Sequence, residues 1–253
     1  MKTAVITGAA SGMGREFVLA VDKEYKLDEI WVIDRNGERL ETLKPLCRTP
    51  LRTLAWDLTD RSRFGEYKKM LEEMKPEIAL LINDAGYGIF GDFEEMDLDE
   101  TLGIVDVNDK ALTAFCLLSL PYMKEGDAIV NMGSNSSWQP VPYQAVYGAS
   151  KAYVLSFSRA IGRELKKRGV HVMCVCPGWI KTDFQERAKH DEVIKYVDRW
   201  YTAKEVIDQA MEDLKKKKKV SILGAPVRRQ VRLVKHLPVD LVMNIWCKQQ
   251  QKD

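Results

Sequence analysis

A tyrosine and a lysine lie four residues apart, at Tyr147 and Lys151. Both fall in a predicted helix, residues 147–167, in which positions i and i+4 share one face, so the two side chains can reach one site. A free tyrosine has a pKa of about 10, too high for efficient proton exchange near neutral pH. A nearby ammonium stabilises the phenolate and lowers that pKa, which predicts an acid–base pair. Ser134 follows a predicted strand, and its hydroxyl could hold a carbonyl oxygen.

Three glycines, Gly8, Gly12 and Gly14, separate a first predicted strand from a first predicted helix. A glycine permits the tight turn between the two elements, and a second lets the backbone approach a pyrophosphate. The N-terminus of the helix then offers free N–H groups to the phosphates. Glycines also occur in ordinary turns, but the strand before and the helix after favour a phosphate-binding loop. Ser11 and Met13 belong to the same loop.

The second predicted strand ends at Asp34, 20 residues after Gly14. A carboxylate at this position can accept hydrogen bonds from the adenosine ribose of a dinucleotide and repels a 2′-phosphate, which favours NAD. Arg35 follows directly and could instead pair with a 2′-phosphate, which leaves NADP open. Arg35 could also be an ordinary solvated side chain.

Short apolar runs alternate with helical patterns along most of the chain. The predicted strands cover residues 3–7, 30–33, 52–56, 78–82, 128–132, 170–175 and 220–223. The predicted helices cover residues 12–21, 37–43, 61–74, 101–120 and 147–167, and one more begins at the capping box formed by Thr202 and Glu205. Continuously apolar strands indicate a parallel sheet covered on both faces. We therefore predict an α/β fold with a single-domain, Rossmann-type, doubly wound parallel sheet of about seven strands and helices on both faces.

The composition narrows the class of protein. The 253 residues are 45% hydrophobic and 30% charged, which excludes wholesale disorder. The net charge of +2 gives no support to nucleic-acid binding. Five cysteines without a Cys-x-x-Cys pair, and only three histidines, argue against a disulfide framework or a metal site. Because no apolar run has the length of a signal core or a membrane span, we expect a cytoplasmic protein.

Together the motifs resemble those of the short-chain dehydrogenase/reductase family, over most of the chain. The glycine loop matches the family's TGxxxGxG, and Asn83-Asp84-Ala85-Gly86 matches its NNAG with Asp84 in place of the second asparagine. Ser134 lies 13 residues before Tyr147, as in the family. Further matches are Asp57 for the acid near the adenine, with Leu58 beside it, Asn108 for the active-site asparagine, and Pro177, Gly178 and Thr182 for the PGxxxT segment, which includes Ile180. Any one of these motifs is weak evidence, but all of them in order are highly specific.

The resemblance implies a role for each matched residue. Tyr147 is the acid–base, and Lys151 lowers the pKa of Tyr147 and holds the nicotinamide ribose. Ser134 orients the substrate oxygen, and Asn108 supports a proton path through water to Lys151. The implied cofactor-binding residues are Gly8, Ser11, Gly12, Met13, Gly14, Asp34, Arg35, Asp57, Leu58, Asn83, Ala85, Gly86, Tyr147, Lys151, Pro177, Gly178, Ile180 and Thr182. The departure at Asp84 is expected to affect only local hydrogen bonding in the sheet.

The expected function is an NAD(P)-dependent oxidoreductase that transfers a hydride between nicotinamide and a secondary alcohol or ketone. NAD is the expected cofactor, with NADP possible. The family also implies a homodimer or homotetramer, packed partly through the helix that carries Tyr147. Two alternatives stay open: a reductase of carrier-linked 3-oxoacyl thioesters, and a dinucleotide-binding regulator without catalysis. The intact Asn108, Ser134, Tyr147 and Lys151 argue against the regulator.

Aromatic residues flank the motifs at Trp138, Tyr143, Trp179 and Phe184. They predict, with Ser134, an apolar substrate pocket for a bulky hydrophobic alcohol or ketone such as a hydroxysteroid. The alternative is that these side chains simply pack the loops. Residues 184–200 lie where the family has a mobile lid.

The C-terminal segment differs in charge from the rest of the chain. Residues 215–253 carry a net charge of +9, and the preceding residues −7. We expect residues 1–225 to form the dinucleotide-binding and catalytic domain and residues 226–253 a basic, partly amphipathic tail. The tail could contact an anionic membrane surface, cap the substrate pocket or pack on a partner subunit. Its apolar stripe consists of Leu241, Val242, Ile245 and Trp246.

Overall fold

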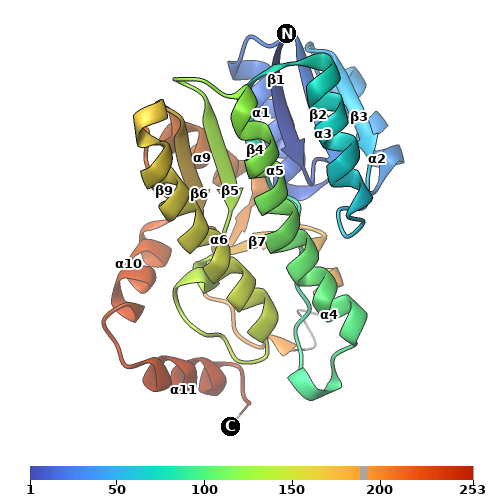
Figure 1. Ribbon diagram of the computed structural model, residues 1–253. Helices are drawn as coiled ribbons and strands as arrows, with labels where there is room; N and C mark the ends of the chain where they lie inside the picture. The colour runs from blue at the N-terminus through green and yellow to red at the C-terminus, as the bar shows by residue number, and fades with distance from the viewer. Residues whose placement is uncertain (189–192, 253) are drawn as a thin grey trace.

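The computed structural model describes residues 1–188 and 193–252. Its centre is a parallel sheet of seven strands in the order β3-β2-β1-β4-β5-β6-β9 (Figure 1). The strands are β1 (Lys2–Thr7), β2 (Glu29–Asp34), β3 (Leu51–Ala55), β4 (Glu77–Asn83), β5 (Ala128–Met132), β6 (His171–Val175) and β9 (Val220–Ser221). The strand order turns back between β1 and β4, where a parallel sheet opens a crevice at its carboxyl edge. The predicted fold class is therefore confirmed.

Successive residues of each central strand are buried against opposite layers of helices. In β1, Ile6 belongs to the core on one face of the sheet, and Val5 belongs to the core on the other. This alternation follows from the period of two along a strand. Because both faces are covered by helices, the strands have the continuous apolar runs that the sequence shows.

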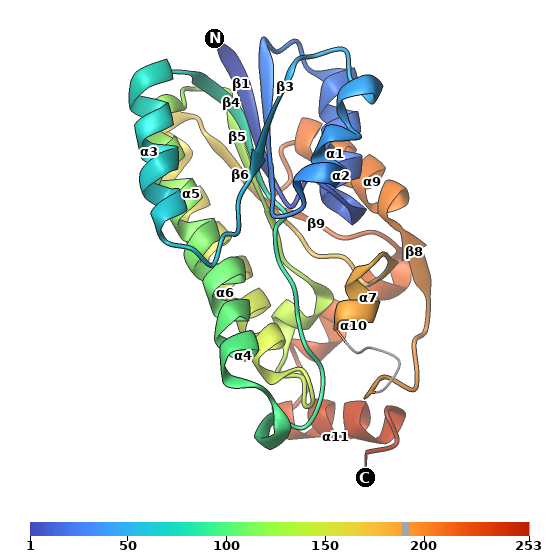
Figure 2. The same ribbon diagram turned by 90° about the vertical axis from the view of Figure 1, so that its right-hand side faces the viewer.

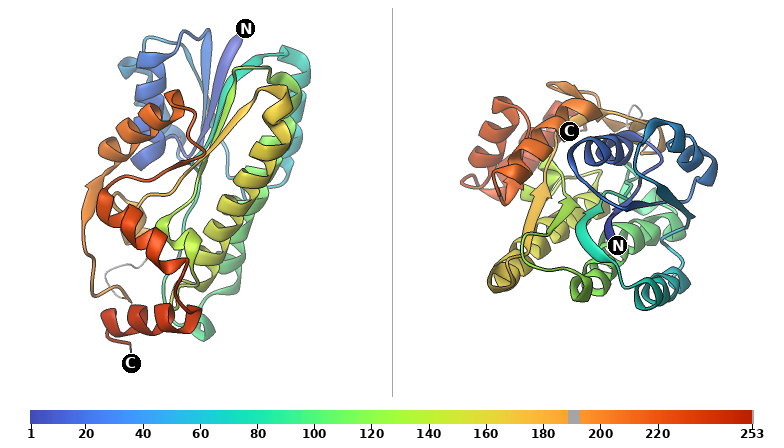
Figure 3. Two further views of the ribbon diagram at one scale, coloured as in Figure 1. Left: turned by 90° about the vertical axis from the view of Figure 1, so that its left-hand side faces the viewer. Right: turned by 90° about the horizontal axis from the view of Figure 1, so that it is seen from above.

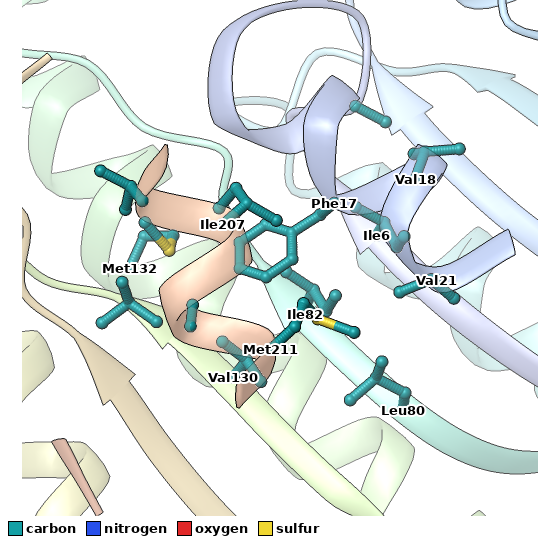
Figure 4. Close-up of a cluster of buried hydrophobic side chains, with 14 of the residues drawn as sticks. Ile6, Phe17, Val18, Val21, Leu80, Ile82, Val130, Met132, Ile207 and Met211 are labelled. Carbon is teal, nitrogen blue, oxygen red and sulfur yellow. The ribbon is translucent and has the colours of Figure 1, made fainter. Parts of the chain in front are cut away.

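The first face is covered by four helices, α1 (Gly12–Glu24), α2 (Gly37–Glu41), α9 (Ala203–Lys215) and α10 (Ala225–Val234). Phe17 of α1 is fully buried, and Figure 4 shows it beside Ile207 of α9, above the strand residues Ile6 and Ile82. The predicted capping box is confirmed, because Thr202 accepts from the Glu205 N–H while the Glu205 side chain accepts from the Thr202 N–H.

The second face is covered by α3 (Ser62–Met74), α4 (Leu98–Val105), α5 (Leu112–Ser119) and α6 (Ala145–Glu164), which Figure 2 shows on the opposite side of the sheet from α1 and α9. The sequence predicted one continuous helix over residues 101–120. The structure instead separates α4 from α5 by a π-helical turn, Asp106–Ala111, which carries Asn108. A π turn adds a residue to the helix and so turns a side chain toward the interior.

Beyond β6 the chain forms structure that the sequence pattern did not predict. Two short parallel strands, β7 (Trp179–Lys181) and β8 (Trp200–Thr202), pair with each other outside the main sheet. Between them lies α7 (Phe184–Arg187). Residues 189–192 of the expected lid lie outside the described residues, so that expectation stays a prediction.

The chain ends in α11 (Val239–Gln249), which Figure 3 shows at the end of the molecule far from the N-terminus. The tail is joined to the main body, since Val227 and Val231 of α10 are part of the first core. In residues 1–188 and 193–252, no helix combines the length and apolar character needed to cross a membrane. The same residues contain no group of three or more metal-ligating side chains.

Candidate active site

Two adjoining hollows lie at the carboxyl edge of the sheet. The glycine-loop groove is bounded by Gly8, Asp34 and Asp57. The tyrosine pocket is bounded by Ser134, Tyr147 and Trp179. Both hollows share Met13, Asp84, Gly86, Thr182 and Phe184, so they meet where these residues lie.

The glycine loop is packed too closely for larger residues. Gly8 has φ +71°, and a Cβ there would lie 2.7 Å from the Ala85 N atom at the end of β4. A Cβ on Gly14 would lie 2.1 Å from the Gly8 carbonyl oxygen. The first turn of α1 has no acidic residue, and its N-cap Ser11 makes no side-chain cap hydrogen bond. One of the N-terminal N–H groups, that of Gly14, donates to the Asp84 carboxyl, and the loop and helix N-terminus that line the groove fit a bound pyrophosphate.

The predicted cofactor residues are distributed over the two hollows. Eleven line the groove: Gly8, Ser11, Gly12, Met13, Asp34, Arg35, Asp57, Leu58, Ala85, Gly86 and Thr182. Five others line the tyrosine pocket: Tyr147, Lys151, Pro177, Gly178 and Ile180. Gly14 and Asn83 line neither. Gly14 allows the close packing of the loop, and the Asn83 Nδ2 donates to Asn131 Oδ1 at 2.8 Å inside the core.

Charged side chains surround Asp34 at one end of the groove. Asp34 is fixed by two backbone donors: its Oδ2 accepts from the Ala10 N–H at 3.2 Å and its Oδ1 from the Asn36 N–H at 3.0 Å. The sequence analysis missed two guanidinium groups here. Arg39 pairs with Asp183 at 2.5 Å, and Arg187 lies 3.6 Å from the centroid of the Tyr87 ring. No local sequence signal reveals them, because Asp183 and Arg187 come from a distant segment.

Tyr147 and Lys151 point to one place from the first turns of α6. The Lys151 Nζ donates to the Met132 carbonyl at 2.9 Å and lies 5.7 Å from the centroid of the Tyr147 ring. Burial raises the pKa of Tyr147 to about 12, and a hydrogen bond with the Ser134 side chain offsets part of that rise. Burial also lowers the pKa of Lys151. In this environment, therefore, desolvation outweighs the lowering of the tyrosine pKa that the spacing predicted.

Asn108 fastens the loop after β4 to helix α6. Its Oδ1 accepts from the Tyr87 N–H at 3.0 Å, and its Nδ2 donates to the Tyr87 carbonyl and to Ser150 Oγ, both at 2.9 Å. A Cβ on Gly86 would lie 2.9 Å from Asn108 Oδ1 and 3.3 Å from Lys151 Nζ. The turn that carries Asn108 thus comes close to the lysine, and the proton path that the family resemblance implied stays a prediction.

Ser134 lies two residues after the end of β5, at the N-cap of the 3-10 turn Asn135–Trp138. Its Oγ accepts hydrogen bonds from the Ser136 N–H at 3.2 Å and contacts Ser136 Oγ at 2.9 Å. These contacts fix the hydroxyl beside Tyr147 at the wall of the pocket.

Aromatic rings form the apolar wall of the tyrosine pocket. Phe184 lies 5.4 Å from Tyr147 and 6.1 Å from Phe90, measured between ring centroids. Trp179 is stacked on Trp246, with centroids 6.5 Å apart. Phe90 has no local sequence signal that links it to the motifs, and Trp246 was predicted only as part of the apolar stripe of a tail that could cap the pocket.

Two of the predicted substrate residues do not line the pocket. The Trp138 ring lies between the Lys235 ammonium and the Arg159 guanidinium, 3.9 and 4.5 Å from its centroid. Tyr143 packs behind the aromatic wall, with the Lys252 ammonium 4.7 Å from its ring. Trp138 and Tyr143 therefore pack the loops around the pocket and do not line it.

A family model described as short chain dehydrogenase matches residues 2–193. The chain belongs to the short-chain dehydrogenase family. An uncharacterised oxidoreductase of Staphylococcus epidermidis is 29% identical over 196 residues, which are 74% of this chain and 84% of the relative. With the glycine loop at the N-terminus of α1, the match identifies an oxidoreductase that uses a nicotinamide dinucleotide.

Two solved structures of short-chain dehydrogenases resemble this one closely. The enzyme of Sphingobium yanoikuyae, in complex with NADPH, has a TM-score of 0.80 at 25% identity, covering 94% of this chain and 97% of that one. An enzyme of Burkholderia phymatum, in complex with NAD, has a TM-score of 0.79 at 21% identity, covering 92% of each chain. The second likeness shows the shared fold alone.

Asp84 lies where the two hollows of this short-chain dehydrogenase meet. Burial raises the pKa of its carboxyl to about 7, although the charge of Lys151 and a hydrogen bond from the Gly14 N–H both oppose the rise. Burial raises the pKa of Asp109, in the π turn, to about 7 as well, again against the charge of Lys151. The expectation that Asp84 affects only hydrogen bonding in the sheet is therefore too narrow, because it adds a titratable group beside the lysine.

We predict that Asp84→Asn stabilises the protein more at high pH than at low pH. When a carboxyl group has a higher pKa in the folded state than in the unfolded state, the folded protein loses stability as pH rises from the unfolded to the folded pKa. For Asp84 that interval runs from 3.8 to about 7. The gain in unfolding free energy should be at least about 1 kcal/mol larger at pH 8 than at pH 5, measured by urea denaturation. The exposed Asp92→Asn is the control. An equal gain at both pH values would contradict the prediction.

Proposed function

We propose that this short-chain dehydrogenase interconverts a secondary alcohol and a ketone with NAD(H) or NADP(H), and that its substrate is bulky and hydrophobic. One observation carries the proposal: Tyr147, Lys151 and Ser134 lie together at the wall of a pocket that opens onto the glycine-loop groove. A substrate oxygen next to Tyr147 would thus lie close to a dinucleotide bound along the groove.

Each residue has a distinct task in the proposed reaction. The Tyr147 hydroxyl gives its proton to the carbonyl oxygen in reduction and takes it back from the alcohol in oxidation. The Ser134 hydroxyl donates a hydrogen bond to the same oxygen. The nicotinamide, when bound, supplies the chemistry of hydride transfer. Because burial raises the pKa of Tyr147 to about 12, the neutral phenol is the resting form and has the proton that carbonyl reduction needs.

The lining of the tyrosine pocket supports a hydrophobic substrate. The rings of Phe90, Phe184, Trp179 and Trp246 line it, and those of Phe90 and Phe184 pack on Tyr147 itself. An apolar wall beside the reacting hydroxyl suits a ring compound with a single reacting oxygen, such as a hydroxysteroid. A carrier-linked 3-oxoacyl thioester is the competing substrate. A regulator without catalysis would not require this assembly of Ser134, Tyr147 and Lys151.

We expect Tyr147→Phe to lower kcat/KM at least about 10³-fold and to change the Kd for reduced cofactor less than about threefold. The change removes the hydroxyl group whose proton the reaction moves and keeps the ring. Reduced-cofactor absorbance with a panel of hydroxysteroids, decalones and smaller ketones measures the first quantity, and cofactor fluorescence measures the second.

Tyr153→Phe, on the same helix, is the matched control and should keep full turnover. Retained turnover in Tyr147→Phe would refute the assigned role. A wild-type enzyme that reduces carrier-linked thioesters but no free ketone would favour the competing substrate instead.

NAD is the proposed cofactor. The two backbone donors that hold Asp34 keep its carboxylate at the adenosine end of the groove, where it would accept from the ribose and repel a 2′-phosphate. Arg35 and Arg187 line the same groove and favour NADP by their charge. Arg39 lines it too, but its guanidinium is already paired with Asp183.

We expect Asp34→Asn to raise the ratio of kcat/KM for NADP to that for NAD by at least about tenfold, because it removes the repulsion of the 2′-phosphate. Steady-state kinetics with both cofactors measure the ratio. Arg35→Ala is the companion variant and should lower the same ratio. A wild-type enzyme that prefers NADP, with a ratio that does not respond to Asp34→Asn, would overturn the proposed preference.

We also propose a homodimer or homotetramer that packs through α4, α5 and α6. These neighbouring helices leave large apolar side chains exposed on their outer face, including Val105, Leu117 and Tyr153, of which Leu117 is 68% exposed. Burial of such a face against a second copy removes apolar surface from water. A two-fold contact of one face with itself is the simplest arrangement.

Leu117→Glu should therefore shift the molar mass from a multiple of the chain mass toward 28.9 kDa. The added charge would have to be buried in the contact, which is costly. Light scattering after size exclusion measures the mass. Leu233→Glu, an exposed leucine on α10, is the control and should leave the mass unchanged. A wild-type protein that is monomeric at all concentrations would refute this proposal.

A further inference from the structure

Helix α11 contributes a wall to the tyrosine pocket from the far end of the chain. Trp246 lines the pocket, and its ring lies nearly parallel to that of Trp179, at an interplanar angle of 14°. The Trp246 Nε1 donates to the Pro142 carbonyl at 3.0 Å, which ties the helix to the loop before α6. The indole is thus held by a hydrogen bond on one side and a stacked ring on the other.

The residue after α11 fastens the opposite side of the pocket. Gln250 is only 1% exposed, and its Oε1 accepts from the Lys195 N–H at 2.8 Å and the Tyr196 N–H at 3.0 Å. Its Nε2 donates to the Tyr196 carbonyl at 3.3 Å. The backbone N–H of Gln250 closes the last turn of α11 by bonding to the Trp246 and Cys247 carbonyls. One amide side chain therefore satisfies three backbone groups of a segment more than fifty residues away.

The segment that Gln250 holds is packed into the aromatic wall. Val193 and Ile194, directly before the bonded residues, are buried with Phe90, against Tyr147 and Phe184. The position of this segment therefore fixes how closely the wall approaches the reacting tyrosine. Loss of the Gln250 side chain would remove the acceptor of the Lys195 and Tyr196 N–H groups and so release the segment from the end of α11.

We propose that α11 sets the size of the substrate pocket, with Trp246 as a specificity-determining wall residue and Gln250 as a positioning residue that holds residues 195–196 against the pocket. This inference deepens the proposed function and rests on it for the identity of the site. Of the three roles considered for the tail, the inward orientation of Trp246 and Gln250 favours the cap of the pocket. The residues of the apolar stripe predicted for the tail do not share one environment, because Val242 is buried while Leu241 and Ile245 are exposed.

The proposal also narrows the substrate class. The wall that α11 adds is the uncharged indole of Trp246, and the charged side chains that line the pocket are Asp84 and Lys151, beside the groove. A substrate with an uncharged, apolar ring body and one carbonyl or hydroxyl group at its end fits this division. A free carboxylate on the body would be desolvated against tryptophan without a cationic partner, which is unfavourable.

The contact of Gln250 is tested without any substrate. In Gln250→Ala, amide hydrogen exchange at residues 195 and 196 should be at least about tenfold faster than in the wild type. Gln249→Ala removes an exposed glutamine from the same helix and should leave that exchange unchanged. Gln250→Glu keeps the acceptor oxygens and should restore most of the protection. Unchanged exchange in Gln250→Ala would overturn the positioning role.

The wall role of Trp246 is tested by substrate selectivity. In Trp246→Ala, the ratio of kcat/KM for 1-decalone to that for cyclohexanone should change at least about tenfold, mainly through KM for the bulky ketone. The cofactor Kd should stay unchanged. The same ratio in the variant and the wild type would overturn the wall role. A wild type that reduces neither ketone nor any other carbonyl compound would refute the proposed function, while the exchange experiment still decides the contact of Gln250.

Discussion

The close approach of the glycine loop to the end of β4 is the constraint on which the rest of the site depends. Because Gly8 lies against Ala85, the two strands at which the sheet order turns back remain in contact where their carboxyl edges open. That contact places the N-terminus of α1 over the groove and Asp84 and Gly86 between the groove and the tyrosine pocket. Any larger side chain at Gly8 would force the two hollows apart.

Burial governs the electrostatics of the site more strongly than spacing does. Tyr147 and Lys151 are four residues apart, yet desolvation raises the pKa of the tyrosine and lowers that of the lysine. Asp84 and Asp109 partly counter the second effect, because their charges favour the ammonium form of Lys151. Among residues 1–188 and 193–252, Lys151 is the cation whose charge acts on both acids, and the charge state of each of the three groups depends on the other two.

What the sequence predicted is what local pattern encodes. The strands, the glycine loop and the pairing of Tyr147 with Lys151 follow from periods of two and four residues and from glycine geometry, and their positions agree with the structure. Phe90, Arg187 and Trp246 could not be predicted, since each reaches the site through packing between segments far apart in the chain. Asp84 was visible as an unusual residue in its motif, but its burial beside Lys151 was not.

The wall of the pocket and the chemistry of the tyrosine depend on each other. The rings of Phe184 and Phe90 desolvate Tyr147, and the segment packed behind them is held by Gln250. A wall that moved outward would admit water, weaken the interaction of Lys151 with Tyr147 and bring the tyrosine pKa back toward its ordinary value. The C-terminal helix would thus influence proton transfer as well as substrate size, without touching the reacting oxygen. Selectivity and acid–base strength in this pocket therefore follow from one packing arrangement.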